Sequence, residues 1–185
     1  MTERQVPTMT LPEFLDWEER QEERYEYVSG QAYLMAGGTI RHSLLVGEFS
    51  ARIREGARKR GCRTHSSDMK LRLPDGSIYY PDLFVSCGSP SSQQYEDDAV
   101  LVIEVLSSST RSRDRREKTR SYGSLPSIQA YVLAEQDIPS MDVATWNDGE
   151  IRWSRLSGDS LLSTPYGAWS VDDIYEAVNA LAPEK

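Results

Sequence analysis

The chain has 185 residues, which is enough for one complete hydrophobic core and short for two, so we expect a single domain over residues 1–185. Its 29 acidic residues outnumber its 21 basic ones and give a net charge of −8. This balance excludes a surface that is basic all round, so contacts with nucleic acid would have to come from local basic patches.

The chain also lacks the marks of a membrane or secreted protein. No apolar run approaches the ~20 residues of a membrane-spanning helix, so we expect no membrane partner. Cys62 and Cys87 lack the CxxC spacing of redox and metal motifs, and the first residues do not form a secretory signal. These observations favour a reducing, cytoplasmic location.

The N-terminal part, residues 10–35, predicts a helix followed by a hairpin. Thr10-Leu11-Pro12-Glu13 is typical of a capping box and predicts a helix that runs to about Arg20. Strands 25–28 and 31–35 then flank Ser29-Gly30, a two-residue loop that suits a tight hairpin turn.

Residues 41–135 predict the core. A helix over residues 41–60 has an apolar face and a basic face, and an apolar run without alternation at 99–106 predicts a strand covered on both sides. The other elements expected here are strands 63–73 and 77–86 around the turn Pro74-Asp75-Gly76, a helix from Ser109 or Thr110 to Gly123, and strand 128–134.

The C-terminal part, residues 140–182, predicts a hairpin and a helix. Strands 141–146 and 150–156 are joined by Asn147-Asp148-Gly149, and the helix starts at a second capping box, Ser170 to Asp173. Helices and strands in this order predict an α/β fold in which a mixed β-sheet is flanked by helices.

Two carboxylates stand out among these elements. Glu104 lies inside the apolar run Val100 to Leu106, where an ionised side chain needs a partner. Asp82 follows Tyr80-Pro81 on the preceding strand, and the two acids together suit Mg²⁺. The alternatives are an ordinary capped strand end for Asp82 and a structural salt bridge for Glu104, to Lys118 or an arginine.

Lys118 is the candidate amine of this site. On a helix it shares a face with Arg111, Asp114 and Tyr122, so it could point back toward the sheet, whereas solvent exposure is the alternative in so basic a run. A lysine beside a metal can orient the attacking water and stabilise charge on phosphorus.

Two further residues are candidates for accessory roles. His42, at the start of the basic helix, could contact a phosphate or shuttle a proton, and a capping or packing histidine is the alternative. Glu26 lies between two tyrosines on the N-terminal hairpin and could extend the acidic cluster, or be a surface glutamate. Phosphate contacts are expected from the basic patches at 41–60 and 111–120, including Arg52, Lys59, Arg115 and Arg116.

Taken in order, these motifs resemble the Uma-two-type "putative restriction endonuclease" family, a bacterial family assigned to the PD-(D/E)XK nuclease superfamily. The resemblance covers roughly residues 10–160. It rests on residues 25–30, His42, residues 80–83, residues 102–107 with Ser109-Thr110, and then Lys118 and Tyr122.

The resemblance implies a restriction-endonuclease-like core in which Asp82 and Glu104 bind Mg²⁺ or Mn²⁺ and Lys118 is catalytic. Tyr122 would be an accessory residue. The superfamily lysine usually follows the second acid by two positions, where this chain has Leu106, so the resemblance implies that Lys118 takes its place from the next helix. The implied activity is hydrolysis of DNA. We also expect a homodimer, because isolated endonuclease domains often cut two strands by pairing two active sites.

Two other functions compete with this hypothesis. The first is a nuclease fold that has lost cleavage and binds nucleic acid or a protein partner. The second treats Asp82 and Glu104 as the acid and base of a glycoside hydrolase, which needs an open sugar cleft and no metal.

Overall fold

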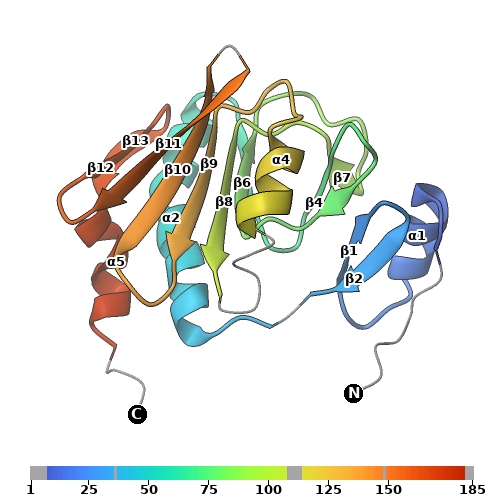
Figure 1. Cartoon of the computed structure of the whole chain (residues 1–185), viewed down its shortest axis with the longest axis horizontal. Helices are drawn as coiled ribbons and strands as arrows, with labels where there is room; N and C mark the ends of the chain where they lie inside the picture. Colours follow the sequence, from blue (N-terminus) through green and yellow to red (C-terminus); the bar gives the residue numbers. More distant parts are fainter. Residues whose placement is uncertain (1–7, 36, 108–113, 148, 182–185) are drawn as a thin grey trace.

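A computed structural model of the chain describes residues 8–35, 37–107, 114–147 and 149–181 and shows an α/β fold with three sheets (Figure 1). The expected fold class, mixed sheet flanked by helices, is confirmed. No helix in these residues is long and apolar enough to cross a membrane.

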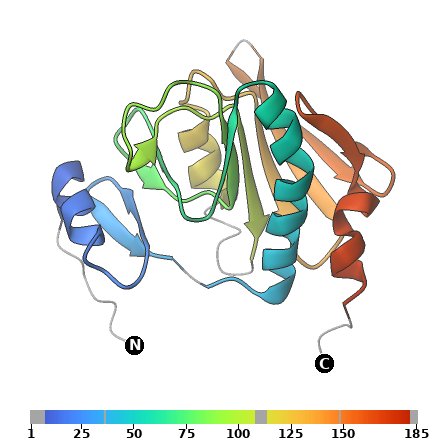
Figure 2. The same cartoon turned by 180° about the vertical axis from the view of Figure 1, so that it is seen from behind.

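The largest sheet has six strands in the order β11-β10-β9-β8-β6-β3, and only the β8–β9 pair is parallel. Helices α2 and α5 cover one face, whereas η1 and α4 lie on the other (Figures 1 and 2). The elements are α2 Ile40–Lys59, β3 Arg63–Ser66, β6 Leu83–Ser86, β8 Leu101–Leu106, η1 Asp114–Lys118, α4 Thr119–Tyr122, β9 Ala130–Glu135, β10 Ser140–Asn147, β11 Glu150–Ser157 and α5 Val171–Asn179.

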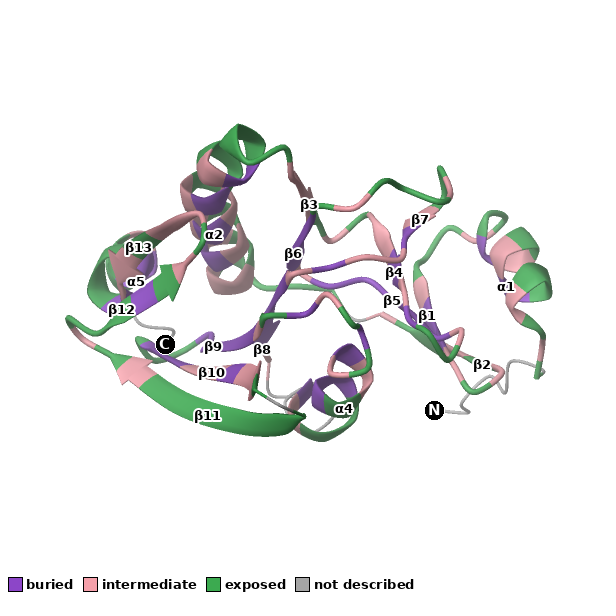
Figure 3. Ribbon diagram, turned by 90° about the horizontal axis from the view of Figure 1, so that it is seen from above, coloured by how far each residue is buried: buried purple, intermediate pink, exposed green. Residues whose placement is uncertain are grey.

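Strand β8 is the centre of this sheet, and all six of its residues are buried (Figure 3). Leu101, Ile103 and Val105 pack in the cluster under α2, and Val102 and Leu106 pack in the cluster under α4. The predicted strand covered on both faces is confirmed.

A second sheet, in the order β2-β1-β5-β4-β7, contains the N-terminal hairpin. The turn Ser29-Gly30 has positive φ at both positions, which tight two-residue hairpin loops require. Helix α1 packs on this sheet through Phe14, stacked 4.9 Å from the Tyr27 ring, and begins with the predicted capping box at Thr10. The elements are α1 Leu11–Glu18, β1 Tyr25–Val28, β2 Gln31–Leu34, β4 Lys70–Arg72, β5 Ile78–Tyr79 and β7 Tyr95–Glu96.

The prediction of two long strands at 63–73 and 77–86 is wrong, because each of these segments is divided between the two sheets. The chain leaves β3 at Ser66 to enter β4, and it leaves β5 at Tyr79 to enter β6. Pro81 lies in the second break and has no backbone N–H for a ladder. The break places Asp82 directly before β6.

The C-terminal part contains one hairpin more than expected. Strands β12 Leu161–Thr164 and β13 Gly167–Ser170 form a separate two-stranded sheet, and only Leu162 among their residues is buried. The apolar residues of this hairpin, Leu161-Leu162 and Ala168-Trp169, are adjacent in pairs, so the sequence shows no alternation that would mark these strands. Helix α5 begins as predicted, with the Ser170 hydroxyl accepting from the Asp173 N–H at 3.1 Å.

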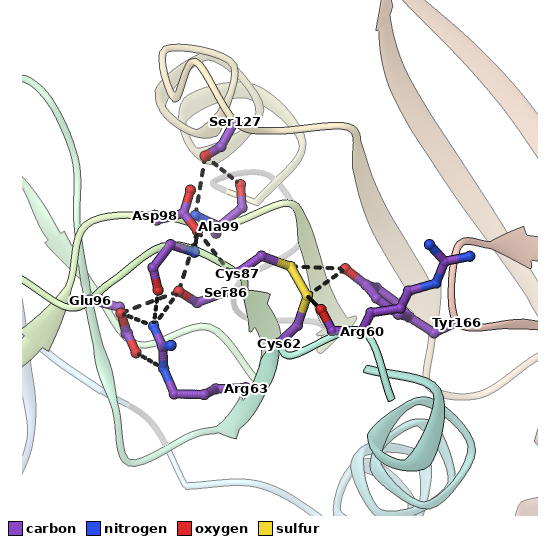
Figure 4. The surroundings of a disulfide bond; sticks show 11 residues. Arg60, Cys62, Arg63, Ser86, Cys87, Glu96, Asp98, Ala99, Ser127 and Tyr166 are labelled. Carbon is purple, nitrogen blue, oxygen red and sulfur yellow. Dashed lines mark hydrogen bonds and ion pairs between the residues drawn. A yellow bond between two sulfur atoms is a disulfide. The ribbon is translucent and has the colours of Figure 1, made fainter. Parts of the chain in front are cut away.

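A disulfide joins Cys62 and Cys87, a pairing that the sequence analysis did not predict (Figure 4). The two cysteines continue the antiparallel register one step beyond the pair Arg63 and Ser86, with their Cα atoms 4.2 Å apart. The Tyr166 hydroxyl lies 3.5 Å from the Cys87 sulfur. Strand register, which cysteine spacing does not reveal, makes this bond possible.

Gly56 lets the β12–β13 turn approach α2, because a Cβ there would lie 2.1 Å from the carbonyl oxygen of Tyr166. We expect Gly56→Ala to lower the free energy of unfolding by about 1–3 kcal/mol in urea titrations, since the turn must move away. Gly47 lies on the same helix with no atom close to its Cβ position. Gly47→Ala is the control and should stabilise by about 0.5–1 kcal/mol. Equal effects would contradict the packing argument.

Candidate active site

The pairing of β6 with β8 brings the two predicted acids to one cleft. The ladder ends at the pair Leu83 and Ile103, so the next residues outward are Asp82 and Glu104. Both line a cleft of about 1040 Å³ that is bordered by the N-terminal hairpin, the start of α2 and the β9–β10 turn. Asp82 also accepts the backbone N–H of Val105 at 2.8 Å, which holds it against β8.

The Lys118 ammonium lies among three carboxylates that come from three different elements. Its Nζ atom is 2.9 Å from Glu104 Oε1 on β8, 3.0 Å from Glu26 Oε1 on β1 and 3.3 Å from Asp114 Oδ1 on η1. The lysine is 6% exposed, so its predicted orientation toward the sheet is correct and the solvent-facing alternative is wrong. Glu26 is 3% exposed and is not a surface glutamate.

A π-turn presents Asp114 and Lys118 to the same place. Element η1 is one wide turn, after which α4 continues as an ordinary helix. The Thr119 hydroxyl donates to the Arg115 carbonyl at 3.0 Å, and the Tyr131 hydroxyl donates to the Asp114 carbonyl at 3.2 Å. Turns of this kind are frequent at functional sites. The expected helix start at Ser109 or Thr110, and Arg111, lie outside the described residues.

Tyr122, the predicted accessory residue, lies one turn after Lys118 and is fully buried. Its hydroxyl donates to Glu104 Oε1 at 2.8 Å, so this oxygen accepts from both the phenol and the ammonium. The contact holds the Glu104 carboxylate in one orientation.

His42 approaches Asp82 from the other face of the sheet, with Nε2 3.1 Å from Asp82 Oδ2. The backbone N–H of His42 donates to the hydroxyl of the N-cap residue Thr39. Gly38 leaves space for the imidazole ring, because a Cβ there would lie 3.0 Å from Nδ1. The hydrogen bond to Asp82 raises the pKa of His42, with burial acting in the opposite direction. His42 is therefore part of the cleft and has more than a capping role.

Excess negative charge characterises the cleft. Burial raises the pKa of Glu104 well above its usual value; Lys118 opposes this shift, and Asp82, Asp114 and Glu26 add to it. Burial alone would lower the pKa of Lys118, but Glu104, Glu26 and Asp114 outweigh it and raise that pKa well above its usual value. These contacts favour the charged form of Lys118, and the acids around it outnumber it.

The donor set suits a hard divalent ion. Among the described residues no three His, Cys, Asp or Glu side chains are arranged to hold one metal. Mg²⁺, however, usually takes one or two protein carboxylates and completes its shell with water and substrate phosphate. Asp82 and Glu104 supply two carboxylates beside an open cleft, and the unbalanced charge described above favours a further cation there.

Of the four residues predicted to bind phosphate, two lie on α2 and two on η1. Arg52 pairs with Glu48 and donates to the Asp173 carbonyl at 2.6 Å, which ties α2 to α5. Lys59 ends α2, 17 residues after His42 and so about 25 Å along the helix. Arg115 pairs with Glu135 and Asp142 on β9 and β10, and Arg116 is exposed.

Asp114 is the site residue that the sequence analysis did not select. In the sequence Asp114 is marked only by its position four residues before Lys118, which places it on the same face of the predicted helix. The sequence also did not show that Glu26 reaches Lys118, because the two residues are 92 positions apart and meet only when both sheets are assembled.

Comparison with known proteins places this chain in a family. Residues 11–172 match the family Uma2, described as "Putative restriction endonuclease". The chain belongs to this family. The resemblance inferred from the sequence is thereby confirmed, and the Uma2 match covers α1 through the first turn of α5.

Two relatives of this chain come from Synechocystis sp. The "Uncharacterized protein slr1290" is 35% identical over 145 residues, which are 77% of this chain and 76% of the relative. The "Uncharacterized protein sll1609" is 30% identical over 133 residues, covering 69% and 75% of the two chains.

The crystal structure of a "putative nuclease belonging to DUF820" from Anabaena variabilis has the same fold, with a TM-score of 0.74 at 16% identity. The match covers 91% of this chain and 98% of that one.

Lys118 also matters for stability, because its removal leaves buried carboxylates without a counter-charge. We expect Lys118→Ala to cost about 3 kcal/mol in the free energy of unfolding at pH 7. The loss should shrink as pH falls toward 4.5, the ordinary value for glutamate. Lys118 lowers the pKa of Glu104 in the parent, so in the folded variant Glu104 binds a proton at higher pH, and a neutral carboxyl group needs no counter-charge.

Denaturant titrations at several pH values measure this effect. Lys59→Ala is the control, since Lys59 is exposed and pairs only with Glu55 on the same helix, and its stability should match that of the parent. An equal loss in both variants, or a loss that grows as pH falls, would show that the cluster around Lys118 is not the cause.

Proposed function

We propose that this protein is a metal-dependent endonuclease that hydrolyses phosphodiester bonds in DNA. The observation that carries the proposal is the buried ammonium of Lys118 beside Glu104 at the bottom of an open acidic cleft. A structural salt bridge needs one carboxylate for one lysine, and here three surround it while Asp82 stands next to them. Membership of the Uma2 family supports the same reaction class.

In this proposal Asp82 and Glu104 hold Mg²⁺ or Mn²⁺ next to the scissile phosphate. The ion would supply Lewis acidity and a bound water of lowered pKa. The Val105 N–H and His42 orient Asp82, while Tyr122 and Lys118 orient Glu104. Lys118 keeps its proton and stabilises negative charge that develops on the attacked phosphate.

His42 has a second part in the proposal. Its raised pKa keeps the imidazole protonated to higher pH than usual, and its ring lies on the cleft wall beside Asp82. A protonated imidazole at this position can contact a phosphate oxygen or give a proton to the leaving oxygen.

The cleft makes binding of a polyanion dependent on cations. Seven carboxylates line it, against one arginine, one lysine and one histidine among the described residues. DNA should therefore enter only after metal ions neutralise part of this charge. Exposed basic residues outside the cleft, of which Arg116 and Lys59 are examples, would then contact phosphates farther along the strand.

A plasmid-nicking assay tests the proposal. With Mg²⁺ or Mn²⁺ the parent should nick supercoiled DNA, and a chelator should abolish the reaction. We expect Asp82→Asn, Glu104→Gln and Lys118→Ala to slow nicking by about 10²-fold or more, because each removes a charge that acts on the transition state.

Asp159→Asn is the matched control, since Asp159 is an exposed carboxylate on the loop before β12, and it should nick like the parent. Circular dichroism verifies that each variant is folded. A parent that never nicks DNA supports the alternative, a non-cleaving module that binds nucleic acid or protein. Nicking that persists in the chelator, or in all three variants, contradicts the proposed mechanism.

We extend the proposal to a homodimer joined through β11. This strand is the longest sheet edge in the described chain, with eight residues, and nearly all of them are exposed (Figure 3). Ile151 and Trp153 are 42% and 44% exposed and lie on the same face. Antiparallel pairing of two copies of β11 would continue the sheet and place these side chains of both copies together.

Sedimentation velocity tests the dimer. Trp153→Lys should shift the protein from dimer to monomer without lowering its melting temperature, because Trp153 is exposed in the single chain. Ile138→Lys is the control, since Ile138 is 51% exposed on the β9–β10 turn and not on β11. A parent that sediments as a monomer, or a variant that remains dimeric, contradicts this interface.

A further inference from the structure

The environment of Lys118 has the form of a cation-binding cage. Three carboxylate oxygens from β1, β8 and η1 lie within 3.3 Å of the ammonium nitrogen; Glu104 Oε1 accepts a hydrogen bond from it, and Glu26 Oε1 and Asp114 Oδ1 form ion pairs with it. All three carboxylates are at most 4% exposed, so water does little to compensate their charge. A single salt bridge would leave two of these carboxylates without reason to converge.

Glu104 connects this cage to the proposed metal site. Its Oε1 atom accepts from the ammonium, and its carboxylate shares the cleft with Asp82. In two-metal hydrolytic sites the ions lie about 3.5–4 Å apart and stabilise the attacking and leaving oxygens together. The ammonium contacts Glu104, which is also a proposed ligand of the metal ion, so the ammonium lies next to the proposed metal site.

We propose that the Lys118 ammonium is a built-in cation that takes the place of a second metal ion, so that the site binds one divalent ion and not two. The inference rests on the proposed function, because it assumes the metal at Asp82 and Glu104. It assigns Glu26 and Asp114 to the ammonium and not to the metal.

The distances show why the cage could accept a metal once the lysine is removed. The ammonium contacts measure 2.9 to 3.3 Å, whereas hard divalent ions bind oxygen at about 2.0–2.6 Å. Each carboxylate would have to move by only about 1 Å to bind an ion in place of the ammonium. Removal of Lys118 also takes the positive charge of the ammonium away from the three buried carboxylates, so binding of a metal ion among them becomes more favourable.

The assignment gives the N-terminal hairpin a defined role. In this assignment Glu26 is a positioning residue, since it contacts the Lys118 ammonium. Its neighbours in β1 pair with β2 and β5, so the second sheet holds one wall of the cage while η1 and β8 hold the others.

Counting of bound Mn²⁺ on the full chain, by calorimetric titration and electron paramagnetic resonance, tests the inference. We expect one Mn²⁺ in the parent and two in Lys118→Ala, with a spectrum that shows magnetic coupling between neighbouring ions. Lys59→Ala should bind one ion, like the parent. One ion in Lys118→Ala, or two in the parent, would overturn the inference and leave the proposed nuclease intact.

Glu26→Gln gives an answer that does not depend on how well Lys118→Ala folds. Because Glu26 belongs to the ammonium, this variant should keep its one Mn²⁺ with an affinity within about threefold of the parent, whereas Asp82→Asn should lose it. Loss of Mn²⁺ from Glu26→Gln would make Glu26 a metal ligand and overturn the inference. A parent that binds no Mn²⁺ would overturn the proposed function as well.

Discussion

The contact between the Lys118 ammonium and three buried carboxylates is the constraint on which the rest of the site depends. Glu26, Glu104 and Asp114 come from two sheets and a π-turn, and the ammonium makes their convergence possible because like charges in a buried site repel each other. The same contact keeps Lys118 charged in an environment that would otherwise favour the neutral amine. Stability and chemistry are therefore coupled at one nitrogen atom.

This coupling explains how one arrangement can be both a salt bridge and a reactive site. The pairing of Glu104 with Lys118 satisfies the structural requirement of a buried acid, yet the acids outnumber the base. In the proposed function, the charge that remains binds a metal ion and, through it, a phosphate. A balanced ion pair would bury the same residues and offer nothing to a substrate, so the proposed function rests on the imbalance.

The fold provides this imbalance by splitting two strands between sheets. Had residues 77–86 formed one strand, Asp82 would lie within a ladder. The break at Tyr80-Pro81 instead leaves it at the end of β6, where Val105 and His42 hold it. The second sheet that the break creates carries Glu26 to Lys118. The hairpin that the sequence presents as an N-terminal addition is thus one wall of the site.

The sequence by itself determined the local elements and the identity of most site residues. Apolar periodicity marked α2, an apolar run without alternation marked β8, and capping patterns marked α1 and α5. Glu104 was selected because a charged group inside an apolar run needs a partner, Lys118 by its register on a helix, and Asp82 and His42 by their places on a strand and at the start of a helix. Only the tertiary structure decided which partners they have. Asp114 in the cage, Glu26 across 92 positions and the disulfide between Cys62 and Cys87 depend on strand register, on a π-turn and on two sheets meeting. Periodicity reports which face of an element is buried, and it does not report what lies opposite that face.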